Sequence, residues 1–332
     1  MNSPLLSIIV PSFNQGAFIA NTLLSVVHQE YQNWEVIIQD GGSSDQTYEA
    51  VKPFLDTDKR ISFKSEKDKG FSDAVNKALL QCKGDYAIIQ NSDDFFSGPH
   101  VFREAVNYLE HYPELYILSA PFNRVDDQFN ELLVQEEMQA EGFVDPMDIY
   151  KLKRTFGQSS TFFSVRRIRE IGLLSLNVDM VADTDTWIRL AVYDPMGEKK
   201  IYYGSQTWSC ATFHPQQRSA DQSKFMTGRA QMFTDLVNNP RVNIGISERK
   251  RIAVVFIADA FEYLINRKMD TEKVEEMYKK VTGQSLPVRK KLKQGLFRID
   301  GIRSLMKGPI EKDGTDYFLN FPRGKNYKWF VS

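Results

Sequence analysis

The first hundred residues alternate between short strand-like runs and stretches with helical spacing, and this alternation limits the fold more than any other feature of the chain. The strand-like runs lie at 5–13, at the start of 34–45, at 61–66 and at 86–90. The segments between them, 14–29, 46–55 and 71–82, have the apolar periodicity of helices. Strands separated by helices of this length form βαβ units. We therefore predict an α/β fold built on a mostly parallel sheet.

Polar residues follow three of these strands, in the clusters PSFN (11–14), DGGSSD (40–45) and NSDD (91–94). Each cluster alone is also what a tight turn or a helix cap requires. Their shared place in the topology favours a binding site, because ligands of parallel sheets lie beyond the carboxyl ends of the strands. Glycine-rich backbone and carboxylates fit a phosphate-bearing ligand with a divalent cation. The Rossmann fingerprint GxGxxG and the P-loop GxxxxGK[ST] are both absent.

Composition excludes several classes of protein. The 42 Lys and Arg nearly balance the 43 Asp and Glu, so no whole-chain charge points to nucleic acid. Two cysteines, Cys82 and Cys210, are too few for a disulfide scaffold, and we expect both to be buried and reduced. The longest apolar run, 252–265, contains Asp259 and Glu262 and is typical of a core helix. We expect a cytoplasmic protein without a targeting signal.

Four segments resemble, in this order, the nucleotide-sugar domain of glycosyltransferase family 2. They are SIIVPSFNQGAFIANTLLSVVHQEYQNWEVIIQDGGSSDQT (7–47), GFSDAVNKAL (70–79), GDYAIIQNSDDFF (84–96) and ADTDTWIRLA (182–191). The resemblance covers about residues 5–219. It implies the GT-A fold, Rossmann-like with helices flanking the sheet, and the transfer of a sugar with inversion from a nucleoside diphosphate sugar.

The resemblance also implies roles for particular residues. Asp40 is expected near the uracil or equivalent base, with Pro11 and Phe13 lining the nucleoside pocket. NSDD takes the place of the DxD motif, so Asp93 becomes the carboxylate for the metal or the diphosphate, and the first acid is replaced by neutral Asn91. The remaining candidates for donor nucleotide binding are Asn14, Gly42, Asp73, Asn76, Asn91 and Ser92.

The chemistry of such a transfer predicts a cation and a base. Departure of a nucleoside diphosphate builds negative charge on a phosphate oxygen, and Mn²⁺ or Mg²⁺ offsets that charge. The resemblance allows His214 to be a further ligand of the metal or the diphosphate, with a structural or surface histidine as the alternative. The acceptor hydroxyl needs one carboxylate as general base, because a single displacement inverts the anomeric centre. By resemblance that base is Asp183.

Three residues are candidates for contacts with the acceptor or for support of the site. Asp185 follows Asp183, the expected general base. It is predicted either to cap the next helix or to accept a hydrogen bond behind that general base. Asp94 and Gln158 are the other two. Gln158 belongs to FGQSSTFFSVRRIREIG (156–172), which resembles the acceptor side of the family's pocket, although an ordinary strand with polar ends also explains it.

Beyond residue 219 helical patterns dominate, so we predict a GT-A domain over 1–219 and an α-helical C-terminal region over 220–332. Helices are expected at 223–239, 247–268 and 271–283, with Ser247 or Thr271 as caps and Gly283 as a stop. Residues 286–332 contain 11 Lys and Arg against 4 Asp and Glu. Within them, 288–306 has helical spacing with a basic face, which fits either a peripheral membrane contact or a helix packed on the domain.

The sequence as a whole predicts an inverting, metal-dependent, non-processive glycosyltransferase. The donor is expected to be a nucleoside diphosphate sugar, with UDP preferred, and the acceptor a hydroxyl of a glycan or lipid-linked molecule in bacterial cell-surface polysaccharide synthesis. A sugar-nucleotide nucleotidyltransferase is the alternative enzyme, but PSFNQGAF lacks the Arg and Lys that its triphosphate loop needs. A non-catalytic sugar-nucleotide-binding protein is the third reading.

Overall fold

The computed structural model describes residues 3–132, 139–214 and 221–286, together with the short strands at 289–290, 297–298 and 323–326. Its main sheet has eight strands in the order β3-β2-β1-β4-β10-β6-β11-β9. These strands are β1 (Leu6–Ser12), β2 (Trp34–Asp40), β3 (Ile61–Ser65), β4 (Tyr86–Ile89), β6 (Ile117–Ser119), β9 (Gly142–Phe143), β10 (Thr161–Ser164) and β11 (Ile201–Tyr203).

A second, five-stranded sheet has the order β15-β8-β7-β12-β5. Its strands are β5 (Phe95–Phe96), β7 (Phe122–Val125), β8 (Asn130–Leu132), β12 (Ser209–Thr212) and β15 (Arg323–Asn326). The helices before residue 220 are α1 (Ile19–Val27), α2 (Thr47–Thr57), α3 (Phe71–Leu79), α4 (Val101–His111), α5 (Pro146–Tyr150), α6 (Val165–Ile171) and α7 (Ala182–Val192). Two 3₁₀ turns, η1 (Gln158–Ser160) and η2 (Asp179–Val181), precede β10 and α7.

The half of the main sheet that holds β3, β2, β1 and β4 is parallel, as the sequence predicts. Strand β10 then runs antiparallel to both of its neighbours, β4 and β6. This reversal brings the start of β10 to the end of β4. As a result η1 lies beside the carboxyl ends of the parallel strands.

The central strands are apolar throughout because both faces of the sheet are covered. Along β1, Ile8 and Val10 contact the core beneath α1, α2 and α4, whereas Ile9 contacts the core shared with α3, α6 and α7. Successive side chains of a strand point to opposite faces, so one strand serves two cores. Cys82 and Cys210 are both buried, as expected, and neither forms a disulfide.

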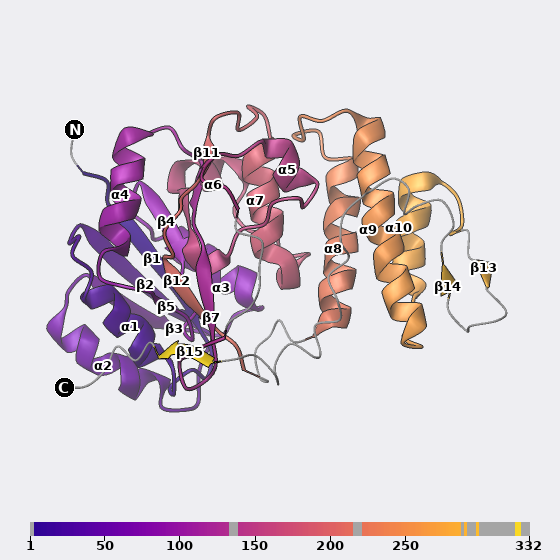
Figure 1. Cartoon of the computed structure of the whole chain (residues 1–332). Coiled ribbons are helices and arrows are strands. Elements are labelled where there is room, and N and C mark those ends of the chain that lie inside the picture. Colours follow the sequence, from indigo (N-terminus) through magenta and orange to yellow (C-terminus); the bar gives the residue numbers. More distant parts are fainter. Residues whose placement is uncertain are drawn as a thin grey trace.

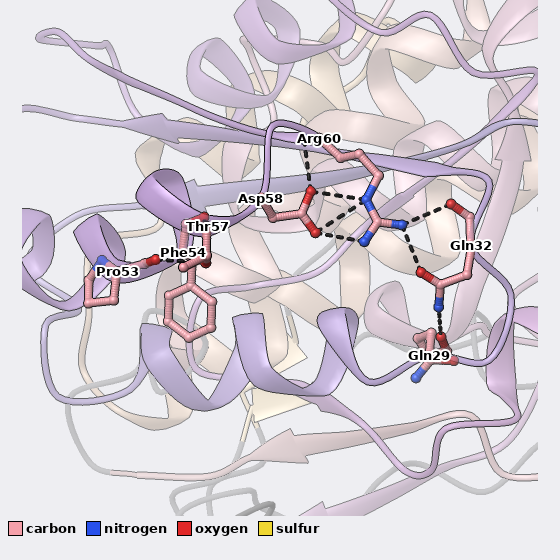
Figure 2. Close-up of polar contacts among 7 residues, drawn as sticks. All are labelled: Gln29, Gln32, Pro53, Phe54, Thr57, Asp58 and Arg60. Carbon is pink, nitrogen blue, oxygen red and sulfur yellow. Dashed lines mark hydrogen bonds and ion pairs between the residues drawn. The ribbon is translucent and has the colours of Figure 1, made fainter.

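Arg60 ties together the loops at the amino ends of β2 and β3 (Figure 2). Its guanidinium pairs with Asp58 at 2.6 Å and donates to the backbone carbonyl and the side-chain oxygen of Gln32 at 2.9 Å each. It also stacks 3.5 Å from the centroid of the Trp34 ring. These contacts lie at the edge of the sheet opposite the polar clusters, so they stabilise the frame and take no part in the site.

Arginines also hold the helices on the α3 face by binding the carbonyl groups where neighbouring helices end. Arg169 of α6 donates to the carbonyl groups of Leu79 and Cys82 after α3, at 2.8 and 2.7 Å. Arg167 donates in the same way to Tyr193 at the end of α7, at 2.8 Å. The last carbonyl groups of a helix lack internal partners and carry partial negative charge, so a guanidinium satisfies and stabilises them.

Three helices stand side by side next to α5 and α7, away from β1–β3 (Figure 1). They are α8 (Gln222–Val237), α9 (Ile246–Asn266) and α10 (Glu272–Thr282), which confirms the three helices predicted there. Helix α10 ends at Gly283 in the left-handed conformation, as predicted. The prediction of Ser247 as a cap was wrong, because α9 begins after Gly245. Thr271 does stand at the N-cap position of α10, although its side chain makes no capping hydrogen bond. No helix among the described residues is long and apolar enough to span a membrane.

The prediction of one helix over 288–306 is wrong where the structure describes that segment. Strands β13 (Arg289–Lys290) and β14 (Phe297–Arg298) form an antiparallel pair there. The rest of 288–306 lies outside the described residues.

Candidate active site

The polar clusters that end β1 and β2 bind each other. Ser12 and Asp40 are partners in the register of the two strands. The backbone N–H of Asn14 donates to Ser43 Oγ at 2.7 Å, and the N–H of Ser44 donates to Asn14 Oδ1 at 2.9 Å. Two of the three clusters predicted to converge therefore form one surface, with Pro11 buried in β1 and the Phe13 ring 59% exposed.

Asp40 organises the loop that follows it. Its carboxylate accepts from the backbone N–H groups of Gly42 and Ser43 and from the hydroxyl groups of Ser43 and Ser65. Gly42 has φ of 88°, which favours glycine. Asp40 itself is 1% exposed. The structure thus places Asp40 beneath the site, where it shapes the loop.

The NSDD turn is held from two sides. Thr22 of α1 donates to the carbonyl groups of Ser92 and Asp94 at 2.9 and 2.7 Å. Thr212 at the end of β12 donates its N–H to Asp94 Oδ1 at 2.9 Å, while Asn91 Nδ2 donates to Asp94 Oδ2 at 3.0 Å. Burial, and then the charge of Asp93, raise the pKa of Asp94 well above its ordinary value. Asp94 is therefore a buried anchor of the turn.

Asp93 faces His214 across 121 residues of sequence, with 3.1 Å between Asp93 Oδ2 and His214 Nε2. The side chains are 17% and 6% exposed. The His214 ring stacks on Phe18 of α1, with 5.2 Å between centroids and 11° between planes. The structure thus brings together the two residues that the sequence nominates as metal ligands.

The segment before β10 joins this site through η1. Gln158 Nε2 donates to Asn91 Oδ1 at 2.7 Å, so both oxygen and nitrogen of the Asn91 amide are engaged. The expected acceptor-side residue is therefore in direct contact with the expected donor-side turn.

Asp183 lies in the first turn of α7, and Thr184 beside it lines a small cavity together with Phe156, two residues before η1. The sequence predicted that Asp185 either caps this helix or accepts a hydrogen bond behind the general base. The cap was wrong, because α7 starts at Ala182 and no side chain caps it. Asp185 instead binds Arg189 one turn on, at 2.7 Å, with both side chains buried.

The buried pair of Asp185 and Arg189 yields a prediction about stability. Replacement of Arg189 by methionine leaves the Asp185 carboxylate buried without its cation, a change that costs about 3–5 kcal/mol. We expect urea denaturation to show that loss in the free energy of unfolding. The double variant Asp185→Leu with Arg189→Met should lose less, and an equal loss in the two variants would contradict this account.

Two candidates for donor binding, Asn76 and Asp73, lie on α3, and their side chains bind neighbouring parts of the protein. Asn76 Nδ2 donates to the carbonyl of Leu174 and Asn76 Oδ1 accepts its N–H, each at 2.9 Å. Asp73 accepts the N–H of Lys69 at 3.0 Å and pairs with Lys77 at 3.3 Å. The structure places neither side chain in contact with the NSDD turn.

Sequence reasoning missed Phe18, Thr22 and Thr212, which support Asp93 and His214. Only the helical spacing around 18–27 pointed to α1, and nothing local to these residues marks their contact with a turn some seventy residues on.

Comparison with known proteins agrees with this architecture. An uncharacterized glycosyltransferase of Haemophilus influenzae is 39% identical over 98 residues, which are 29% of this chain and 39% of that protein. The TuaG glycosyltransferase of Bacillus subtilis, named for a putative role in teichuronic acid biosynthesis, is 38% identical over 92 residues, 27% of this chain and 36% of that protein. In both cases the match spans well under two thirds of the relative.

Two solved structures have a similar fold. TarS 1–349 of S. aureus in complex with UDP-GlcNAc superposes with a TM-score of 0.65 at 16% identity, covering 84% of this chain and 79% of that one. The mannosyltransferase PcManGT of Pyrobaculum calidifontis, in complex with GDP-Man and Mn²⁺, gives 0.53 at 16% identity over 84% and 73%.

The sheet order, the flanking helices and the polar turns at the strand ends define a GT-A fold. Residues 7–170 match the family model described as Glycosyl transferase family 2. Those residues, just under half of the chain, therefore form a domain of this family.

Proposed function

We propose that this protein is an inverting, metal-dependent, non-processive glycosyltransferase. The observation that carries the proposal is the pair of Asp93 and His214 at the end of the parallel strands, adjoining the loop of η1. The donor is a nucleoside diphosphate sugar, with UDP as the preferred nucleotide. UDP-GlcNAc in the complex of a structural neighbour supports this choice.

The residues present fit a divalent cation. Cis ligands at about 2.1 Å from an octahedral metal lie roughly 3.0 Å apart, and the two facing atoms of Asp93 and His214 are 3.1 Å apart. Within the described residues no group of three His, Cys, Asp or Glu side chains could hold a metal, so the diphosphate and water would complete the coordination. When bound, Mn²⁺ or Mg²⁺ would offset charge on the leaving diphosphate.

Asp183 is the proposed general base, which takes the proton of the acceptor hydroxyl as the new bond to the sugar forms. Asp183 lies in the first turn of α7, close to the 3₁₀ turn η2 that precedes this helix. Neutral Asn91 remains a polar link that holds Gln158 against the turn.

The acceptor is proposed to be a hydroxyl of a glycan or lipid-linked molecule. The teichuronic acid role in the name of one relative supports cell-surface polysaccharide synthesis. The division into a catalytic domain over 1–219 and a helical region over 220–332 is part of the same proposal. A membrane contact through 288–306, and a cytoplasmic location, stay predictions of the sequence.

Thermal denaturation with a panel of nucleotide sugars tests the proposal directly. A ligand that binds only the folded state stabilises it by RT ln(1 + [L]/Kd), so we expect a UDP-sugar to raise Tm, and to raise it further when Mn²⁺ is added. A donor that stays intact with every acceptor tried would favour the binding-protein alternative. Release of pyrophosphate from UTP and a sugar phosphate would favour the nucleotidyltransferase.

A further inference from the structure

Asp68 has one carboxylate oxygen in use and one available. It lies in the loop between β3 and α3, and its Oδ1 accepts the backbone N–H of Gly70 at 2.9 Å. Gly70 has φ of 115°, a conformation that holds the turn and thereby the carboxylate. Asp68 Oδ2 accepts no hydrogen bond from any residue that the structure describes, and the side chain is only partly buried.

The available oxygen lies beside the exposed Phe13 ring. A Cβ built on Gly41 would be 2.7 Å from Asp68 Oδ2 and 3.3 Å from Phe13 Cδ2. The carboxylate oxygen and the ring edge therefore both approach the same glycine, which has no side chain to separate them. A flat apolar surface next to a hydrogen-bond acceptor is what a nucleoside base requires.

Asp40, the other carboxylate of this region, has no such capacity. Asp40 already accepts four hydrogen bonds from Gly42, Ser43 and Ser65, three at Oδ2 and one at Oδ1. With 1% of its surface exposed, the Asp40 side chain has no access to a ligand.

We propose that Asp68, rather than Asp40, recognises the base of the donor nucleotide. A carboxylate only accepts hydrogen bonds, so Asp68 selects a base with a ring N–H at the centre of its pairing edge, as uracil and thymine have at N3. Cytosine has a lone pair at N3 and is disfavoured there. This assignment rests on the proposed function and adds to it the residue that sets base specificity.

Calorimetric titration with UDP and CDP tests the assignment without relying on catalysis. Asp68→Ala should weaken UDP binding about 10–100-fold, the range for one hydrogen bond with a charged partner. Asp68→Asn, which can both donate and accept, should lower the preference for UDP over CDP. Asp40→Asn should weaken both ligands alike, because it alters the loop. Asp56→Asn on the exposed face of α2 is the matched surface control and should leave both affinities unchanged.

Two failures are distinguishable. If the unmodified protein binds neither UDP nor CDP, with or without Mn²⁺, the proposed function fails. If the unmodified protein binds UDP, and the Asp68 variants keep both the affinity for UDP and the preference for UDP over CDP, the assignment of Asp68 is overturned. The proposed function is not affected by that result. If Asp40→Asn changes the preference for UDP over CDP and Asp68→Asn does not, Asp40 is the residue that recognises the base.

Discussion

Replacement of Asp183 by asparagine is expected to abolish measurable sugar transfer while the donor still binds. The amide has nearly the volume of the carboxylate but cannot take the proton of the acceptor hydroxyl, and a positioned base contributes on the order of 10²–10⁴-fold in rate. Product formation by mass spectrometry gives the rate, and titration with UDP gives donor affinity. We expect the loss in kcat, with the affinity for UDP unchanged.

The control for Asp183 is again Asp56→Asn, which changes an exposed carboxylate of α2. Turnover retained in Asp183→Asn would remove this residue from the mechanism. Loss of UDP binding together with turnover would instead assign Asp183 to the donor pocket.

Asp93→Asn is expected to remove the dependence of donor binding on the cation. The substitution keeps an oxygen facing His214 but removes its charge, and hard cations prefer charged oxygen ligands. Even groups that only support a metal ligand contribute roughly 10–100-fold to affinity, so the loss for a ligand should reach at least that range. Calorimetric titration of UDP in the presence and absence of Mn²⁺ measures it.

His214→Gln provides the companion variant. It should reduce the Mn²⁺ effect in the same direction, since it removes the facing nitrogen and leaves the Asp93 carboxylate in place. Equal Mn²⁺ enhancement of UDP binding in the unmodified protein and in Asp93→Asn would rule out Asp93 as a metal ligand.

Much of the fold followed from local patterns. The apolar run through Ile8, Ile9 and Val10 predicted a strand of a mostly parallel sheet. The register of β1 with β2 then brought two of the polar clusters together. Periodicity also located α8, α9 and α10 to within two residues at each end. Local patterns are enough to predict a helix or a strand when the spacing of its own apolar residues determines its structure.

The predictions failed where the structure is determined by contacts between distant residues, or by contacts that compete with one another. Asp185 was expected to cap α7 because acids favour helix starts, but Arg189 is one turn away and both are buried, so the ion pair prevails over the cap. Other contacts lay beyond the reach of local patterns without contradicting a prediction. The bond from Ser65 to Asp40, 25 residues away in sequence, is one of them. The approach of His214 to Asp93 was expected only through family resemblance, since spacing alone says nothing about residues so far apart.

The reversed strand β10 has a consequence for how such a protein can diversify. Strand β10 is antiparallel to β4, and η1 directly precedes it. The chain therefore reaches the carboxyl end of β4 at η1 before it enters the sheet, without the crossover helix that a parallel strand would need. The stretch between β9 and η1 can therefore lengthen, shorten or change sequence without shifting the strands that carry the clusters of β1 and β2. Under the proposed function, the part around β1 and β2 would stay constant for the nucleotide while the stretch before η1 is exchanged to suit a new acceptor.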